Sequence, residues 1–165
     1  MKTLYLVRHA KSSWKYPKLD DFERPLNKRG RKSAPFMGEV LKELNVSLDL
    51  IISSPASRAA TTARIMAAKI DYPLENIRYS ESIYEFSEGA LIQVVKHIDD
   101  EVVEAMIVGH NPALNAIANY LGDQSVSNIP TAGIYCLDLD IASWSNIHEN
   151  CGKFKFFEYP KKHSH

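Results

Sequence analysis

The chain has 165 residues, of which 45% are hydrophobic and 24% charged, a balance typical of a soluble globular protein. Its 20 basic residues equal its 20 acidic residues, so no net charge draws it to nucleic acid or a membrane surface. No apolar run approaches the roughly 18 residues that a transmembrane helix needs. We expect one domain over residues 1–165 that binds neither nucleic acid nor membrane, and any anion must meet a local cluster of cations.

The start of the chain and its cysteines favour a cytoplasmic protein. One lysine precedes the segment TLYLVRH, which is too short and too polar for a secretory signal. Cys136 and Cys151 stand outside any CxxC or metal-ligand spacing, so we expect reduced thiols. The C-terminal KKHSH is interpreted as a frayed tail and not as a metal site.

The first half of the chain alternates strand and helix. Residues 3–8 are apolar enough for a buried strand, and a polar loop follows. Residues 26–46 place apolar side chains at the three-and-four spacing of a helix, with Asn27 as a candidate N-cap. A second short strand is predicted over 48–54 and an alanine-rich helix over 56–70.

The same alternation continues beyond residue 75. Residues 75–86 are predicted to contain a short edge strand, and residues 89–99 a helix. A third buried strand over 104–110 precedes a helix over 111–122, which has proline in its first turn and glycine at its end.

The last two predicted strands, 131–141 and 152–159, show the alternating pattern of half-buried strands and are candidates for an antiparallel edge. Strands that alternate with helices favour a sheet covered on both faces. The sequence therefore predicts an α/β fold: a three-layer α/β/α sandwich with a mostly parallel central sheet and an antiparallel edge.

Side chains suited to phosphate chemistry follow three of the predicted strands. Arg8 and His9 end the first, Arg58 lies in the first helical turn after the second, and His110 follows the third. Each residue alone has an ordinary explanation, in a loop, on a helix surface or in a turn. Ligands bind at the carboxyl ends of parallel strands, so together these residues predict an anion pocket. Phosphate is the expected anion, because a planar guanidinium contacts two of its oxygens at once.

The segments LVRHA, PLNKRG, SSPASRAATTA and VGHNP, in this order and spacing, resemble the histidine phosphatase superfamily. This superfamily also contains the cofactor-dependent phosphoglycerate mutases, so the resemblance implies a phosphoglycerate mutase-like fold. Ala10 stands where the superfamily usually has glycine. That difference, the RHAKSSW continuation and the short chain resemble the SixA-type phosphohistidine phosphatases.

The resemblance implies a division of roles among the four residues. His9 would accept the phosphoryl group, and Arg8, Arg58 and His110 would complete the phosphate pocket, with no metal and no cofactor. Histidine attacks as the neutral imidazole, and two flanking arginines should lower the pKa of His9. His110, if protonated, could donate a hydrogen bond to the phosphate.

Three further residues are candidate substrate contacts. Lys11 and Ser12 follow the proposed nucleophile and could contact phosphate, although a solvated loop is the more common arrangement. Asn111 stands next to His110, and capping of the following helix is an alternative role for it.

The general acid is expected in the segment SESIYEFSEGAL, because many superfamily members take it from the corresponding position. Glu81, Glu85 and Glu88 are available there. We predict Glu85, which ends a short apolar stretch. Glu88 could instead begin the following helix, and exposure of all three carboxylates to solvent is an equal alternative.

The sequence thus predicts a metal-independent phosphatase that dephosphorylates phosphohistidine in a protein. An imidazole leaves more readily than an alkoxide, so such a substrate depends less on the general acid. The alternatives are a phosphatase of a small phosphate ester and a non-catalytic phosphate-binding module. A mutase is less favoured, because the short chain leaves little material to hold a bisphosphate intermediate.

Overall fold

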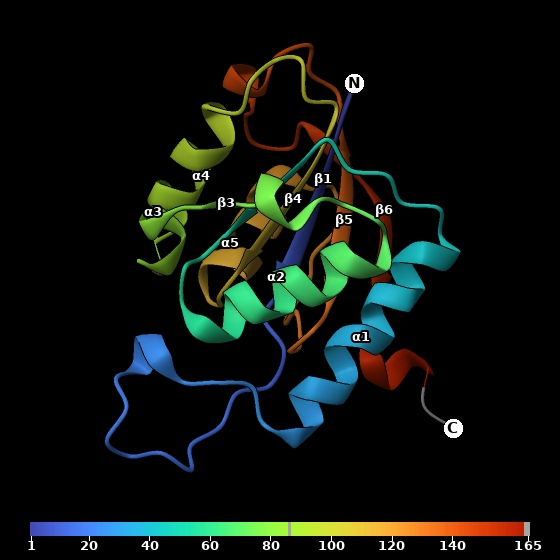
Figure 1. Ribbon diagram of the computed structural model, residues 1–165. Coiled ribbons are helices and arrows are strands. Elements are labelled where there is room, and N and C mark those ends of the chain that lie inside the picture. The colour runs from blue at the N-terminus through green and yellow to red at the C-terminus, as the bar shows by residue number, and fades with distance from the viewer. Residues whose placement is uncertain (86, 164–165) are drawn as a thin grey trace.

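The computed structural model describes residues 1–85 and 87–163 and contains a six-stranded mixed sheet in the order β3-β2-β4-β1-β5-β6 (Figure 1). The strands are β1 (Lys2–Arg8), β2 (Leu50–Ser53), β3 (Arg78–Tyr79), β4 (Glu104–Gly109), β5 (Ile134–Leu139) and β6 (Gly152–Glu158). The first four pair in parallel, whereas β5 pairs antiparallel with both β1 and β6. The mostly parallel sheet with an antiparallel edge is therefore confirmed.

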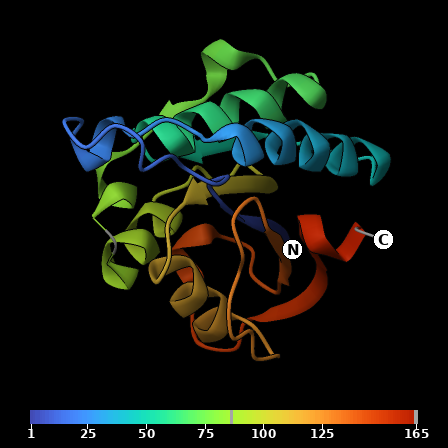
Figure 2. The same ribbon diagram turned by 90° about the horizontal axis from the view of Figure 1, so that it is seen from below.

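Helices cover both faces of this sheet. They are α1 (Lys28–Glu43), α2 (Ser57–Lys69), α3 (Glu81–Tyr84), α4 (Glu88–Lys96) and α5 (Ala113–Leu121). Figure 2 shows α1 and α2 on one side of the sheet and α3, α4 and α5 on the other, which confirms the three-layer arrangement. No helix in the described part of the chain is long and apolar enough to cross a membrane.

The central strand β1 is anchored in two apolar cores, one on each face. Leu4 and Leu6 pack in the core under α4 and α5, and both are fully buried. Tyr5 and Val7 pack in the core under α1 and α2. Burial of each such side chain contributes about 1.5–3 kcal/mol, so the strand is a firm support for the residues at its end.

The helices begin and end close to the predicted positions. Asn27 caps α1 as expected, since its side-chain oxygen accepts a hydrogen bond of 2.8 Å from the Gly30 amide. Pro35 lies inside α1 without ending it. The expected edge strand in 75–86 is only two residues long, and the unpredicted helix α3 follows it; residue 86 lies outside the described residues.

The tail prediction is wrong for residues 161–163. They lie in a 3-10 helix, η4 (Pro160–His163), instead of a frayed end. Both His163, at 2.7 Å, and Lys162, at 3.1 Å, bond the carboxylate of Glu158, which holds this helix to the end of β6. Residues 164 and 165 lie outside the described part. Cys136 and Cys151 are free and buried, in agreement with the expected thiols.

The loop after β1 lies close against the start of α1, below the sheet in Figure 1. The Asn27 amide donates a 2.9 Å hydrogen bond to the Lys11 carbonyl, and the Ser13 amide donates a 2.8 Å bond to the Pro25 carbonyl. Gly30 makes the approach possible, because a Cβ there would overlap the Lys11 carbonyl oxygen. The PLNKRG motif thus fixes the path of the chain just after His9.

We predict that Gly30→Ala lowers the free energy of unfolding by about 1–3 kcal/mol, because the new methyl group forces this backbone apart. Urea unfolding measures the change. Gly89→Ala is the matched control, because the nearest atom of a described residue to its Cβ would be the Ser87 Oγ at an ordinary 3.7 Å. Equal stability of the two variants would contradict the close approach.

Candidate active site

His9 lies immediately after β1 with its imidazole almost completely buried. Its Nδ1 is 2.7 Å from the carbonyl oxygen of Ala10. A carbonyl can only accept, so Nδ1 carries the hydrogen of the neutral ring and Nε2 keeps its lone pair. The local backbone therefore makes Nε2 the nucleophilic atom of His9.

Burial lowers the pKa of His9 to about 4. The hydrogen bond to Ala10 acts in the opposite direction, while the charges of Arg58, Arg8 and Arg24 lower the pKa further. The sequence predicted the direction from the arginines alone, but removal from water is the larger cause. At neutral pH the imidazole is in its attacking form.

Arg58 is held at the beginning of α2 and is buried. Its guanidinium donates hydrogen bonds to the Asp21 backbone carbonyl at 2.7 Å and to the Asp21 carboxylate at 3.0 Å. Its own carbonyl accepts from the Thr62 hydroxyl at 2.7 Å, and Thr62 Oγ1 accepts from the Ala10 amide at 2.9 Å. The first turns of α2 are thereby tied to the chain next to His9.

Ala10 fits this position without glycine. It is fully buried in the core under α1 and α2 and is not among the residues with positive φ. The superfamily's usual glycine is therefore not required here for backbone conformation.

Arg8 is the last residue of β1 and is half-buried. One guanidinium nitrogen donates to the Ile129 carbonyl at 3.2 Å, whereas Nε is buried without a hydrogen-bond partner among the described residues. Burial lowers the pKa of Arg8, yet no described carboxylate forms an ion pair with it. A guanidinium in this situation is suited to bind an anion.

His110 lies beside His9, with ring centroids 5.2 Å apart. Its Nε2 is 2.8 Å from the hydroxyl of Ser54, the residue that follows β2. Burial, followed by the effects of His9 and Arg58, lowers the pKa of His110 to about 3. We therefore expect a neutral ring at pH 7, not the protonated donor considered from the sequence.

Three residues that the sequence did not single out, Asp21, Arg24 and Tyr84, form a hydrogen-bonded cluster with Arg58. Asp21 accepts hydrogen bonds from Arg24 at 2.8 Å, from Arg58 at 3.0 Å and from the Tyr84 hydroxyl at 2.8 Å. Burial would raise the pKa of Asp21, but the bonds from Tyr84, Arg24 and Arg58 lower it to about 2. Arg24 also donates to the Ser12 hydroxyl. Asp21 is therefore ionised, and its carboxylate holds Arg24 and Arg58 in fixed positions.

The candidate contacts next to the histidines differ in their surroundings. Ser12 is buried and bonded to Arg24, whereas Lys11 is exposed. The Asn111 side chain accepts from the Asn115 amide at 3.1 Å, and it donates to the Ile129 carbonyl at 3.0 Å. The helix-capping alternative for Asn111 is therefore present, and its contact with substrate stays a prediction.

The carboxylates of the expected acid segment lie at the ends of short helices. Glu85 follows α3 as its C-cap, is exposed, and makes no side-chain hydrogen bond or ion pair with a described residue. Glu88 is the first residue of α4 and follows the N-cap Ser87. This agrees with the alternative that Glu88 begins the helix. Glu85 as general acid stays a prediction.

Known proteins share this sequence pattern and this fold. The sequence model of the histidine phosphatase superfamily (branch 1) matches residues 4–92, which include Arg8, His9 and Arg58. The chain belongs to the histidine phosphatase superfamily.

Relatives of similar length extend the match over nearly the whole chain. An uncharacterized protein of Mycobacterium tuberculosis, Rv1276c, is 31% identical over 94% of this chain and 100% of its own. The solved structure of a protein from Agrobacterium tumefaciens, assigned as the phosphohistidine phosphatase SixA, is 26% identical with a TM-score of 0.78, covering 96% and 98% of the two chains. The protein histidine phosphatase SixA complexed with tungstate shares the fold, with a TM-score of 0.82 at 18% identity, over 97% and 98% of the chains.

We predict that at pH 6 His9 is neutral and in the Nδ1–H form, whereas an ordinary histidine with a pKa near 6.5 is mostly protonated. The reason is its burial and its bond to Ala10. Nitrogen-15 spectra of histidine-labelled protein measure both states, and His9→Gln assigns the signal. An imidazolium at pH 6, or a neutral ring protonated at Nε2, would contradict the assignment of the nucleophilic atom.

Proposed function

We propose that this protein is a metal-independent phosphatase that works through a phosphohistidine intermediate on His9. The observation that carries the proposal is the buried neutral imidazole of His9, whose Nδ1 is committed to the Ala10 carbonyl. It follows Arg8 at the end of β1, and the charge of Arg58, at the beginning of α2, acts on it. A module that only bound phosphate would need the arginines but not a histidine prepared for attack.

The reaction has two displacements at phosphorus. Nε2 of His9 attacks the phosphorus and forms a P–N bond, while the bond to the leaving group breaks and the leaving group takes a proton from the proposed acid Glu85 or from water. Water then attacks the phosphohistidine, its P–N bond breaks, and inorganic phosphate and free His9 are released. Arg8 and Arg58 stabilise the charge on the non-reacting phosphate oxygens in both steps.

Phosphohistidine in a protein is the proposed substrate. The fold is shared with SixA phosphohistidine phosphatases, and an imidazole leaving group needs less help from an acid than an alkoxide does. The exposed Glu85, held by no described contact, is consistent with such a substrate. A small phosphate ester is the second candidate, because a cavity of about 710 Å³ lies next to Arg8, within the size range of small-molecule sites.

We further propose that residues 1–165 form one histidine phosphatase domain and that the protein is cytoplasmic. The single sheet, which draws strands from residue 2 through residue 158, supports the first proposal. The two free, buried thiols of Cys136 and Cys151 support the second.

We predict that His9→Ala lowers kcat/KM for an aryl phosphate at least about 1,000-fold, because the attacking atom is removed. His148→Ala is the matched control, since His148 is exposed in the connection between β5 and β6 and should not affect turnover. The wild-type phosphoenzyme should be labile in acid and stable in alkali, as a phosphoramidate is. Undiminished turnover of His9→Ala, or an alkali-labile adduct, would contradict the mechanism.

Glu85→Gln tests the general acid. If Glu85 protonates the leaving group, the variant should lose about 10²–10⁴-fold in kcat on an alkyl phosphate and much less on a phosphohistidine peptide. Glu81→Gln, which changes another exposed carboxylate of the same segment, is the control. Equal and negligible losses on both substrates would show that Glu85 is not the acid.

A further inference from the structure

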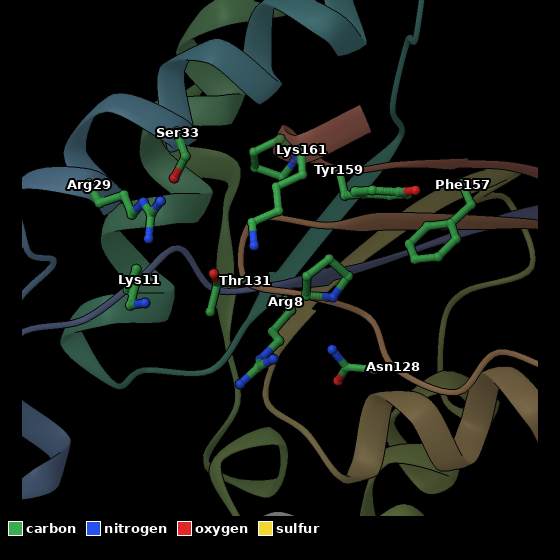
Figure 3. Close-up of a pocket in the computed structure, with 11 residues that line it drawn as sticks. Arg8, Lys11, Arg29, Ser33, Asn128, Thr131, Phe157, Tyr159 and Lys161 are labelled. Carbon is green, nitrogen blue, oxygen red and sulfur yellow. The ribbon is translucent and has the colours of Figure 1, made fainter. Parts of the chain in front are cut away.

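A cavity beside the strand ends is lined by four positively charged side chains. It has a volume of about 710 Å³ and lies between the first turns of α1 and the 3-10 helix η4. We call it the cationic groove and define it by Arg8, Lys11, Arg29, Phe157, Tyr159 and Lys161 (Figure 3). None of the described residues that line it is acidic.

The groove cations are not neutralised within the described part of the chain. The side chains of Lys11, Arg29 and Lys161 form no hydrogen bond or ion pair with a described residue. Figure 3 shows their nitrogen atoms directed toward a common space, together with the hydroxyl groups of Ser33 and Thr131. Like charges so placed repel one another, and a bound anion would relieve that repulsion.

Three cations near the groove are paired with carboxylates, unlike those that line it. Arg58 and Arg24 bond to Asp21, and Lys162 bonds to Glu158. The charges of these three cations are thus compensated by carboxylates, whereas the cations that line the groove remain available for a ligand.

The wall that carries Lys161 is held in place by side-chain contacts. Glu158 bonds both Lys162 and His163, and the His163 ring packs edge-on against Phe36 of α1 at 5.5 Å. These contacts fix η4 over α1 and place Lys161 opposite Arg29. The groove is therefore built by the fold and does not depend on a loose tail.

Arg8 connects the groove to the proposed reaction site. It precedes His9 in the chain and also lines the groove. A phosphoryl group on its way to His9 would lie at one end of the groove, and the remainder of the substrate could extend along it. A volume of about 710 Å³ far exceeds that of one phosphate and falls within the range of sites for organic ligands.

We propose that the cationic groove binds a second anionic group, a carboxylate or a phosphate, carried by the leaving-group part of the substrate. The proposal rests on the function proposed above and narrows its substrate class. Phe157 and Tyr159 supply apolar surface for the part of the substrate that links the two anions. The second anion can come from an acidic side chain near a phosphohistidine or from a small phosphorylated acid, since both present the same chemistry.

The test uses two matched pairs of substrates. One pair is carboxybenzyl phosphate and carbamoylbenzyl phosphate; the other is a phosphohistidine peptide with a neighbouring Glu or Gln. Binding is measured by calorimetry on His9→Ala protein, so that it does not depend on turnover. We expect tighter binding of the acidic member, by about tenfold, in at least one pair.

Two double variants in the His9→Ala background locate the effect. Arg29→Gln with Lys161→Gln should reduce the preference for the acidic member to less than about twofold. Lys32→Gln with Lys42→Gln is the control, because it removes two charges from exposed positions of α1 outside the groove. The control should keep the full preference.

Each outcome decides the proposal. A preference confined to the peptide pair identifies a protein as the source of the anion, and one confined to the benzyl pair identifies a small molecule. Equal binding within both pairs, or a preference that survives Arg29→Gln with Lys161→Gln, overturns the proposal. Wild-type protein that binds the acidic substrates preferentially but hydrolyses none of the four would instead contradict the proposed function.

Discussion

The parallel pairing of β1 with β4 determines where the chemistry of this molecule lies. Arg8 pairs with Gly109, and the His9 amide donates a 3.1 Å hydrogen bond to the Gly109 carbonyl. Because the two strands end level, the residues that follow them must lie together, and the His9 and His110 rings are 5.2 Å apart. The two apolar cores hold β1 in this register from both faces, so the fold itself aligns the site.

The arginines around the end of β1 differ in whether a carboxylate neutralises them, and the proposed function depends on this difference. Arg58 and Arg24 share the carboxylate of Asp21, which fixes their positions. Arg8 has no such partner among the described residues and belongs to both the strand end and the cationic groove. The neutral imidazole of His9 is suited to attack a phosphoryl group. The guanidinium groups of Arg58 and Arg8 are suited to stabilise the negative charge of its oxygens.

The sequence predicted the parts of this arrangement that depend on local patterns. Hydrophobic periodicity located the buried strands and the main helices, and the parallel order brought the ends of β1, β2 and β4 together. Asp21 and Tyr84 escaped notice because they lie in two very short helices, Asp21–Glu23 and Glu81–Tyr84, far from Arg58 in the chain. No sequence spacing predicts their hydrogen bonds. Lys161 of η4 escaped notice because its position depends on the contacts of Glu158 with Lys162 and His163.

The most direct test of the account is a crystal structure of the protein with orthovanadate, which resembles the transferred phosphoryl group. The account predicts vanadium bonded to Nε2 of His9, with its oxygens within hydrogen-bond distance of the Arg8 and Arg58 guanidinium groups. Vanadate bonded to Nδ1 or to another residue, or bound away from both arginines, would contradict it.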